Sequence, residues 1–398
     1  MAALRLDNHS TIRLDQALKK YQVGGVDDVA AFLATTRDQV QTVELGRDFI
    51  RSLDLNSKEV LLEDIGDLPH LRAVSFMGGS IPAKGLAWLL RGGRGLEVLR
   101  FSDGDLHGSR RDFEEMDAAL AGHSNLQEFS FINFDVVDNE GKIVYHKLDG
   151  LIKQLCTVKS LTILRLEASN QERMTFDGTG MASLFSSTHL QELHLSHFCL
   201  SSMHLRMLTW AIRKAPLEKL SVQYAHLNDE DISKLSRYLG SCQHLQELDL
   251  SGNIFGNEGC IALCNAISES KCISKLTLLD NKKIGKDGYS ALSDMLLRNK
   301  VLSTLVIPGR MYNSTIQKRL ESNAKNNKAA LAAWGKKMTP NKALPPLSPS
   351  RFPFHSSFIF FHMIHQFPGP VTQLATIYFF VDMRDTLEKF WRRIVSFT

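Results

Sequence analysis

The sequence lacks the short motifs that mark many enzyme sites. It contains neither a G-x-x-x-x-G-K-[ST] nor a G-x-G-x-x-G run for phosphate binding, and neither H-E-x-x-H nor G-x-S-x-G. The glycine-rich stretch GGRG at residues 92–95 precedes an apolar segment and is interpreted as the end of a helix. We therefore expect no catalytic residue, no cofactor and no enzymatic activity.

Cysteine is scarce and unpaired in sequence: six residues are spread over the chain and none forms a C-x-x-C pair. The N-terminal stretch also lacks the apolar core of a signal peptide. Reduced thiols that fill the core are therefore favoured over zinc ligands or disulfides. We expect a cytoplasmic or nuclear protein that is not secreted.

Histidine gathers in one stretch, at His189, His194, His197 and His204. A metal site needs three or four converging ligands, and only His194 lies on a segment that is predicted to be a strand facing inward. Scattered surface histidines are thus favoured over a zinc site, and no metal is expected.

Positive charge is low and unevenly placed. The net charge is +4, yet the segment from Lys325 to the end carries ten Lys or Arg and three Asp or Glu. The first 324 residues then hold 37 Lys or Arg against 40 Asp or Glu. A nucleic-acid reader shows a basic face on its folded domain, so we expect no nucleic-acid partner.

The C-terminal part has a different composition. Seven of the eleven prolines lie between Pro340 and Pro370, and the segments after them are apolar only in short patches. A membrane span needs about 20 apolar residues in a row. Residues 385–395 have an amphipathic pattern that suits a membrane surface, a partner groove or the chain's own last repeat. We interpret residues 325–398 as a Pro-rich linker and an irregular basic and apolar tail, and expect no membrane contact.

One pattern organises the rest of the chain: apolar-x-x-apolar-x-apolar. Its copies are VQTVEL, LRAVSF, LEVLRF, LQEFSF, LTILRL, LQELHL, LEKLSV, LQELDL, ISKLTL and LSTLVI, starting at residues 40, 71, 96, 126, 161, 190, 217, 245, 273 and 302. Successive starts differ by 25 to 35 residues. Self-similarity at a near-constant period indicates a repeat architecture.

Each copy is predicted to be a strand followed by a helix, because alternation gives way to apolar residues at helical spacing. Parallel strands stack about 4.8 Å apart, whereas packed helices need about 8–10 Å. The mismatch predicts an α/β solenoid shaped as a horseshoe, with parallel strands on the concave side and helices on the convex side. We assign residues 1–39 to an N-terminal helical cap, from helical patterns at Ile12-Leu14-Leu18 and Val29-Phe32-Leu33, and residues 40–324 to about ten repeats.

The repeats resemble the leucine-rich repeats of ribonuclease inhibitor and its intracellular relatives. The best copy is LQELDLSGNIFGNEGCIALCNAIS, residues 245–268. Its Asn253 stands where that family carries an asparagine that bonds the turn backbone, Gly259 matches a glycine before the helix, and Asn281 matches in the next repeat. Earlier repeats carry other residues at the asparagine position.

The resemblance implies a non-enzymatic scaffold that binds proteins and is monomeric alone. Two alternatives use the same repeat type: a GTPase-activating regulator resembling the Ran GTPase-activating proteins, and a sensor module resembling the repeat domains of immune receptors. The Ran-type regulators act through an arginine in an early loop, but neither Arg110 nor Arg111 aligns with it residue by residue.

The concave face is formed by the third, fifth and seventh residues of each copy. Most are small or of mixed charge, but the early repeats place apolar side chains where water is expected, beside arginines. The candidate partner-binding residues are Val98, Arg100, Ile132, Ile163, Arg165 and His194. The alternative is that the long segment from Asn133 to Gly150 is a loop that folds over them.

Overall fold

The computed structural model describes residues 10–14, 26–143, 145–168, 179–308 and 314–337. The chain divides into two compact units, Met1–Ala332 and Ala333–Thr398. The fold described below is that of the first unit. The predictions for the Pro-rich segment after residue 337 and for the helix at 385–395 lie outside the described residues.

The first unit is built on one parallel sheet of eleven strands, which follow one another in chain order. The strands are β1 (Thr11–Arg13), β2 (Thr42–Gly46), β3 (Ala73–Pro82), β4 (Val98–His107), β5 (Glu128–Val137), β6 (Ile163–Glu167), β7 (Glu192–Ser196), β8 (Lys219–Gln223), β9 (Glu247–Asp249), β10 (Lys275–Thr277) and β11 (Thr304–Val306). Equivalent positions pair from repeat to repeat, so that Leu220, Leu248, Leu276 and Leu305 form one row.

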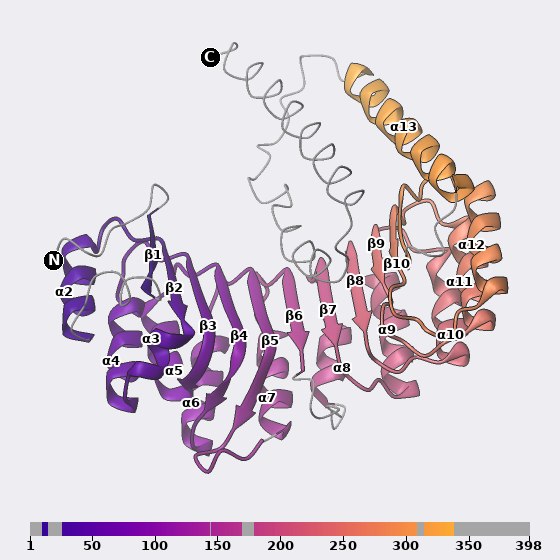
Figure 1. Ribbon diagram of the computed structural model, residues 1–398. Coiled ribbons are helices and arrows are strands. Elements are labelled where there is room, and N and C mark those ends of the chain that lie inside the picture. Colours follow the sequence, from indigo (N-terminus) through magenta and orange to yellow (C-terminus); the bar gives the residue numbers. More distant parts are fainter. Residues whose placement is uncertain (1–9, 15–25, 144, 169–178, 309–313, 338–398) are drawn as a thin grey trace. The chain divides into compact units, whose positions relative to one another are not determined.

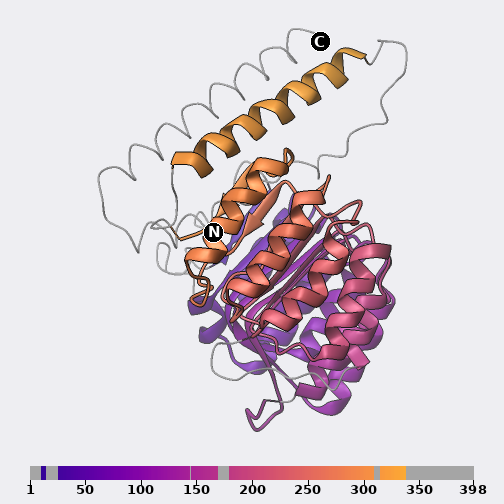
Figure 2. The same ribbon diagram turned by 90° about the vertical axis from the view of Figure 1, so that its right-hand side faces the viewer.

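Helices connect the strands and cover one side of the sheet, as Figures 1 and 2 show. They are α2 (Val26–Thr36), α3 (Arg47–Ser52), α4 (Leu55–Gly66), α5 (Ala83–Gly92), α6 (Arg110–Ala121), α7 (Tyr145–Leu155), α8 (Thr179–Ser186), α9 (Ser202–Lys214), α10 (Asp229–Leu239), α11 (Asn257–Glu269), α12 (Lys286–Arg298) and α13 (Ser314–Lys337). The strands line the inner side of the curve and the helices its outer side, which confirms the predicted α/β solenoid.

The core follows from the repeat pattern. In the best copy Leu245, Leu248 and Leu250 are at most 1% exposed, because they stand at the first, fourth and sixth positions and point between the sheet and the helices. Alternation sends the third and fifth positions to the opposite face. Each repeat thus buries its apolar side only by stacking on its neighbours.

Buried asparagines tie the later repeats together. The Oδ1 of Asn253 accepts the backbone N–H groups of Ala225 and Leu227, each at 3.1 Å, and its Nδ2 donates to the carbonyl oxygens of Val222 and Leu250, each at 2.9 Å. Asn281 repeats the arrangement by accepting the N–H of Asn253 at 3.0 Å. The predicted backbone-bonding role of both asparagines is confirmed.

A second asparagine relay, which the sequence did not suggest, bonds carbonyl groups near the C-terminal ends of α11 and α12. Asn299 donates to the carbonyls of Ile267 and Ser270 in the preceding repeat. Asn323 donates in turn to the carbonyls of Asn299 and Leu302. Both asparagines are 2% exposed, so they satisfy backbone groups that water does not reach.

Three local predictions need correction. The segment from Ile12, which was expected to be helical, begins as a strand. Thr11–Arg13 pair with β2, and the alternate residues Ile12 and Leu14 point into the core. Residues 133–137, expected to be a loop, continue β5, since Phe134 and Val136 are buried. Helix α13 runs on to Lys337, past the expected end of the solenoid at residue 324, because no proline occurs between Pro308 and Pro340.

Candidate functional site

The sheet register brings the six predicted residues together on the face that carries no helices. The fifth residues of four successive repeat copies lie side by side across β4 to β7. They are Arg100, Ser130, Arg165 and His194. Val98 and Ile163 flank Glu128 at the third position, and Ile132 lies at the seventh. We call this set, with Glu128, the concave patch.

The centre of the concave patch is the carboxylate of Glu128, whose side chain is 8% exposed. Arg100 binds it from one side through Nε and Nη2, at 2.8 Å to each carboxylate oxygen. Arg165 binds it from the other side through Nη1 at 2.6 Å. One buried carboxylate therefore fixes two guanidiniums that come from strands two repeats apart.

The ion pairs continue along the sheet as a ladder. Arg165 also donates to Glu192 at 3.0 Å, and Lys219 donates to the other oxygen of Glu192 at 2.7 Å. Glu247 then lies between Lys219 and Lys275, at 3.9 Å and 2.9 Å. The Nε2 of His194 lies 3.8 Å from a carboxylate oxygen of Glu192. The cations of this face are thus matched by carboxylates of the same chain.

Burial raises the pKa of Glu192, but the contacts with His194 and Lys219 and the charge of Arg165 outweigh it and lower the pKa to about 2. A carboxyl whose folded pKa lies below its ordinary value of 4.5 stabilises the fold above that value. The contribution is lost as the pH falls from about 4.5 towards 2. The ladder is therefore sensitive to acid.

We predict that Glu192→Gln lowers the free energy of unfolding by about 2 kcal/mol at neutral pH and by much less below about pH 3, because the glutamine has no charge to lose. Urea denaturation of both proteins across this pH range measures the difference. Glu114→Gln, which removes an exposed ion pair with Arg110 on α6, is the matched control and should change little. A constant difference at all pH values would contradict the prediction.

The apolar part of the concave patch is half-buried. Val98, Ile132 and Ile163 are neither fully covered nor fully open. Met77, next to Ser102 and in the same row as Ile132, is 49% exposed. Of the segment Asn133–Gly150 that was expected as a covering loop, residues 133–137 extend β5 in register and α7 begins at Tyr145. The contact patch remains a hypothesis, which we carry forward.

The later half of the same face has a different chemistry. Burial is the main cause of a raised pKa at Asp249, the last residue of β9. It also raises the pKa of Glu167, the last residue of β6. His197 and Tyr224 stack with ring centroids 4.6 Å apart, and the Tyr224 hydroxyl donates to Asp280 at 3.1 Å. Both rings belong to residues with positive φ at strand ends, where the chain turns away from the sheet.

The role of Glu128 was missed from the sequence, in which only the arginines, the apolar residues and His194 were chosen as candidates. A signal was present, since Glu128 stands at the third position between repeats that carry arginine at the fifth. Neighbouring strands place such residues on one diagonal, within reach of a long side chain. Glu192, between Arg165 and Lys219, follows the same rule.

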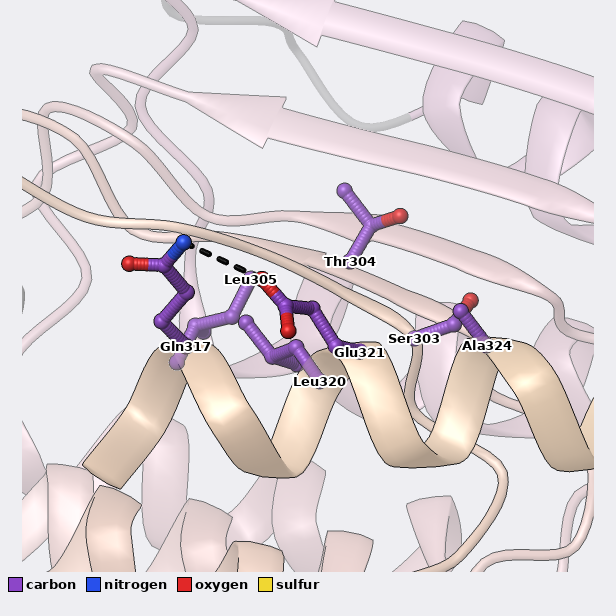
Figure 3. Close-up of a pocket in the computed structure, with 7 residues that line it drawn as sticks. All are labelled: Ser303, Thr304, Leu305, Gln317, Leu320, Glu321 and Ala324. Atoms are coloured by element: carbon purple, nitrogen blue, oxygen red, sulfur yellow. Dashed lines mark hydrogen bonds between the residues drawn. The ribbon is translucent and has the colours of Figure 1, made fainter. Parts of the chain in front are cut away.

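The described residues offer little for catalysis. A hollow of about 490 Å³ between β11 and α13 is lined by Ser303, Thr304, Leu305, Gln317, Leu320, Glu321 and Ala324. Its carboxylate, Glu321, accepts a hydrogen bond from Gln317 at 3.1 Å (Figure 3). Among the residues that the structure describes, no three His, Cys, Asp or Glu side chains form a group that would hold a metal ion.

Other sequence expectations concern the cysteines and the membrane. All six cysteines are free thiols, of which Cys242, Cys260 and Cys264 are buried. Within the described residues, no helix has the length and apolar character to cross a membrane. Arg110 and Arg111 open α6 and bind Glu114 and Glu115 of the same helix.

Comparison with known proteins agrees with the repeat geometry. A leucine-rich-repeat family model matches residues 241–264. The chain is 27% identical over 189 residues to the ribonuclease inhibitor of Sus scrofa, covering 46% of this chain and 39% of that protein. It is 25% identical over 246 residues to NACHT, LRR and PYD domains-containing protein 12 of Homo sapiens, covering 60% of this chain and 22% of that protein.

Among solved structures, an internalin from Listeria monocytogenes aligns with 67% of this chain and 80% of that chain, at 14% identity and a TM-score of 0.36. The chain spans less than half the length of the two curated relatives. The repeat pattern, the in-register parallel strands and these sequence matches together support a leucine-rich-repeat protein that is similar to the ribonuclease inhibitors.

Proposed function

We propose that the chain is a non-enzymatic scaffold that binds protein partners through the concave face of its repeats. The observation that carries this proposal is the concave patch, in which half-buried Val98, Ile132 and Ile163 surround arginines fixed by Glu128. Apolar side chains beside arginine are typical of residues that dominate protein interfaces.

The ion pairs prepare the patch for binding. Because Arg100 and Arg165 are already held by Glu128, a partner does not have to order them, and the entropic cost of association falls. Their side chains remain 34% and 21% exposed. The patch therefore suits a segment with an apolar centre and a few carboxylate or carbonyl acceptors, recognised at short range.

The prediction is that replacing Val98, Ile132 and Ile163 together by serine weakens partner binding at least about tenfold, because interface hot spots are buried apolar anchors. Arg100 is kept, since its loss would leave the buried carboxylate of Glu128 with fewer partners. Proteins recovered with the tagged chain are compared by quantitative mass spectrometry, and one purified partner is then titrated by calorimetry.

The matched control is Ile261→Ser with Leu297→Ser, on α11 and α12, where the side chains are 39% and 45% exposed. Partners lost with the first variant and kept with the control support the concave face. Equal recovery by both variants, with unchanged thermal melting, would refute it.

The match to a protein with NACHT and PYD domains favours a second candidate, a sensor module resembling immune-receptor repeat domains. The Ran-type alternative has less support, because neither Arg110 nor Arg111 aligns with that family's arginine and each binds a glutamate four residues on in α6. A GTP hydrolysis assay with a Ran-type GTPase separates this regulator from a scaffold.

A further inference from the structure

Helix α9 exposes an apolar stripe on the side of the solenoid opposite the concave patch. Met203 is 67% exposed and Trp210 is 47% exposed, the largest exposed fractions for these residue types among the described residues. They lie seven residues apart, about two helical turns, and so share one side of the helix. Arg206 and Arg213, both exposed, fall on the same side.

The stripe carries positive charge that no carboxylate pairs with among the described residues. Helix α9 contains no Asp or Glu. Among the residues that the structure describes, neither Arg206, Arg213 nor Arg237 on the neighbouring α10 makes an ion pair. On α6 of the same outer layer, by contrast, Arg110 and Arg111 each bind a glutamate. We call Met203, Arg206, Trp210, Arg213 and Arg237 the convex patch.

The helix beneath the convex patch is firmly held. Leu205, Leu208 and Ile212 are at most 2% exposed on its inner side. Its first turn is closed by a capping box, in which Ser201 accepts the N–H of His204 and His204 Nδ1 accepts the N–H of Ser201. The exposed tryptophan and methionine are therefore displayed on an ordered helix and do not result from a frayed one.

We propose that the convex patch binds an acidic amphipathic helix of a partner protein. Apolar side chains at i and i+7 match the spacing at which a second helix presents its own apolar residues, and the arginines beside them match carboxylates one turn away. Tryptophan and arginine are the side chains that most often dominate binding energy at interfaces. The Arg213 guanidinium already lies 5.7 Å from the Tyr238 ring, which widens the platform onto α10.

A protein helix fits this surface better than a phosphate polymer or a lipid headgroup. Phosphates would use the arginines but leave Met203, the most exposed apolar side chain, in water. Burying an aliphatic or aromatic side chain of this size is favourable only when the partner is apolar at that point. The partner must therefore combine carboxylates and apolar residues at helical spacing.

The probe is a fluorescein-labelled synthetic helical peptide with leucine at every third and fourth position and glutamate between. Fluorescence anisotropy should show binding to the full chain, weakened at least about tenfold by Trp210→Ala and by Arg206→Glu with Arg213→Glu. The same peptide with glutamine for glutamate should bind more weakly, and its affinity should depend less on salt. Thermal melting checks that these exposed substitutions leave the fold intact.

Arg110→Glu with Arg111→Glu, on the exposed start of α6, is the matched control and should bind the peptide like the parent. Failure of the parent to bind, or equal binding by all variants, would overturn the proposal. Tighter, patch-dependent binding of phosphatidylserine vesicles or single-stranded RNA than of the peptide would also overturn it. The concave patch is unchanged in every variant, so none of these outcomes bears on the proposed scaffold function.

Discussion

Replacing Asn253 with alanine is expected to lower the free energy of unfolding by about 3–4 kcal/mol, because it strands several backbone groups in the core at about 1–3 kcal/mol for each one left unsatisfied. Asn253 is 3% exposed and accepts two backbone N–H groups while donating to two carbonyls. These groups lie at the turn between β8 and α10 and at the end of β9. The alanine fills none of these roles.

Urea denaturation measures this loss, and Asn265→Ala is the matched control. Asn265 is exposed on α11, so its replacement should change the free energy of unfolding by less than about 0.5 kcal/mol. The two variants remove the same functional group from one repeat. Similar midpoints for both would show that the amides of Ala225 and Leu227 find other partners when Asn253 is removed.

The repeat positions could be predicted from the sequence because one physical requirement recurs in every copy. Leu248 and its equivalents must be buried, so an apolar residue, most often leucine, marks each strand, and the near-constant period fixes how the strands stack. The rows of the concave face then follow from alternation alone. Arg100, Ser130 and Arg165 are in register as predicted.

The misses occur where the local pattern is short or ends early. Around β1 only two buried residues, Ile12 and Leu14, show the alternation of a strand. Two apolar residues do not distinguish a strand from a helix. In β4 and β5, Asp103 and Asn133 have positive φ and look like turn residues, but the strands continue after them. Pairing with a neighbouring strand outweighs the turn preference there.

The candidate site was predictable in position but not in chemistry. The register places Val98, Ile163 and the arginines together, whereas the rotamers that turn Arg100 and Arg165 onto Glu128 depend on the packing around them. The sequence-based hypothesis assigned these arginines to the binding of a partner. Their present partners are carboxylates of the chain itself, so recognition would have to add to an existing network.

Phe101 is the centre of the largest aromatic cluster among the described residues. Phe101 is 1% exposed, and its ring centroid lies 4.9, 5.3, 5.7 and 5.8 Å from those of Phe76, Phe134, Phe131 and Phe129. These rings come from β3, β4 and β5, whose strands are longer than the others. The cluster thus packs the repeats of β3, β4 and β5 against one another.

Phe101→Ala should lower the free energy of unfolding by about 3–5 kcal/mol, since the cavity adds to the lost burial and to the lost ring pairs. Phe101→Leu should cost less than half as much, because most of the volume is kept. Repeats contact only their neighbours, so the loss should be local. Hydrogen exchange should speed up first in β2 to β5, while β8 to β10 stay protected.

The comparison variant is Phe255→Ala, which removes a ring that is 0% exposed in the repeat of Asn253. It should cost a similar free energy but speed exchange in β8 to β10 instead. If both variants accelerated exchange equally in every strand, the solenoid would unfold as one cooperative unit. The aromatic cluster would then act as general core packing, and the idea that it stabilises the early repeats locally would be wrong.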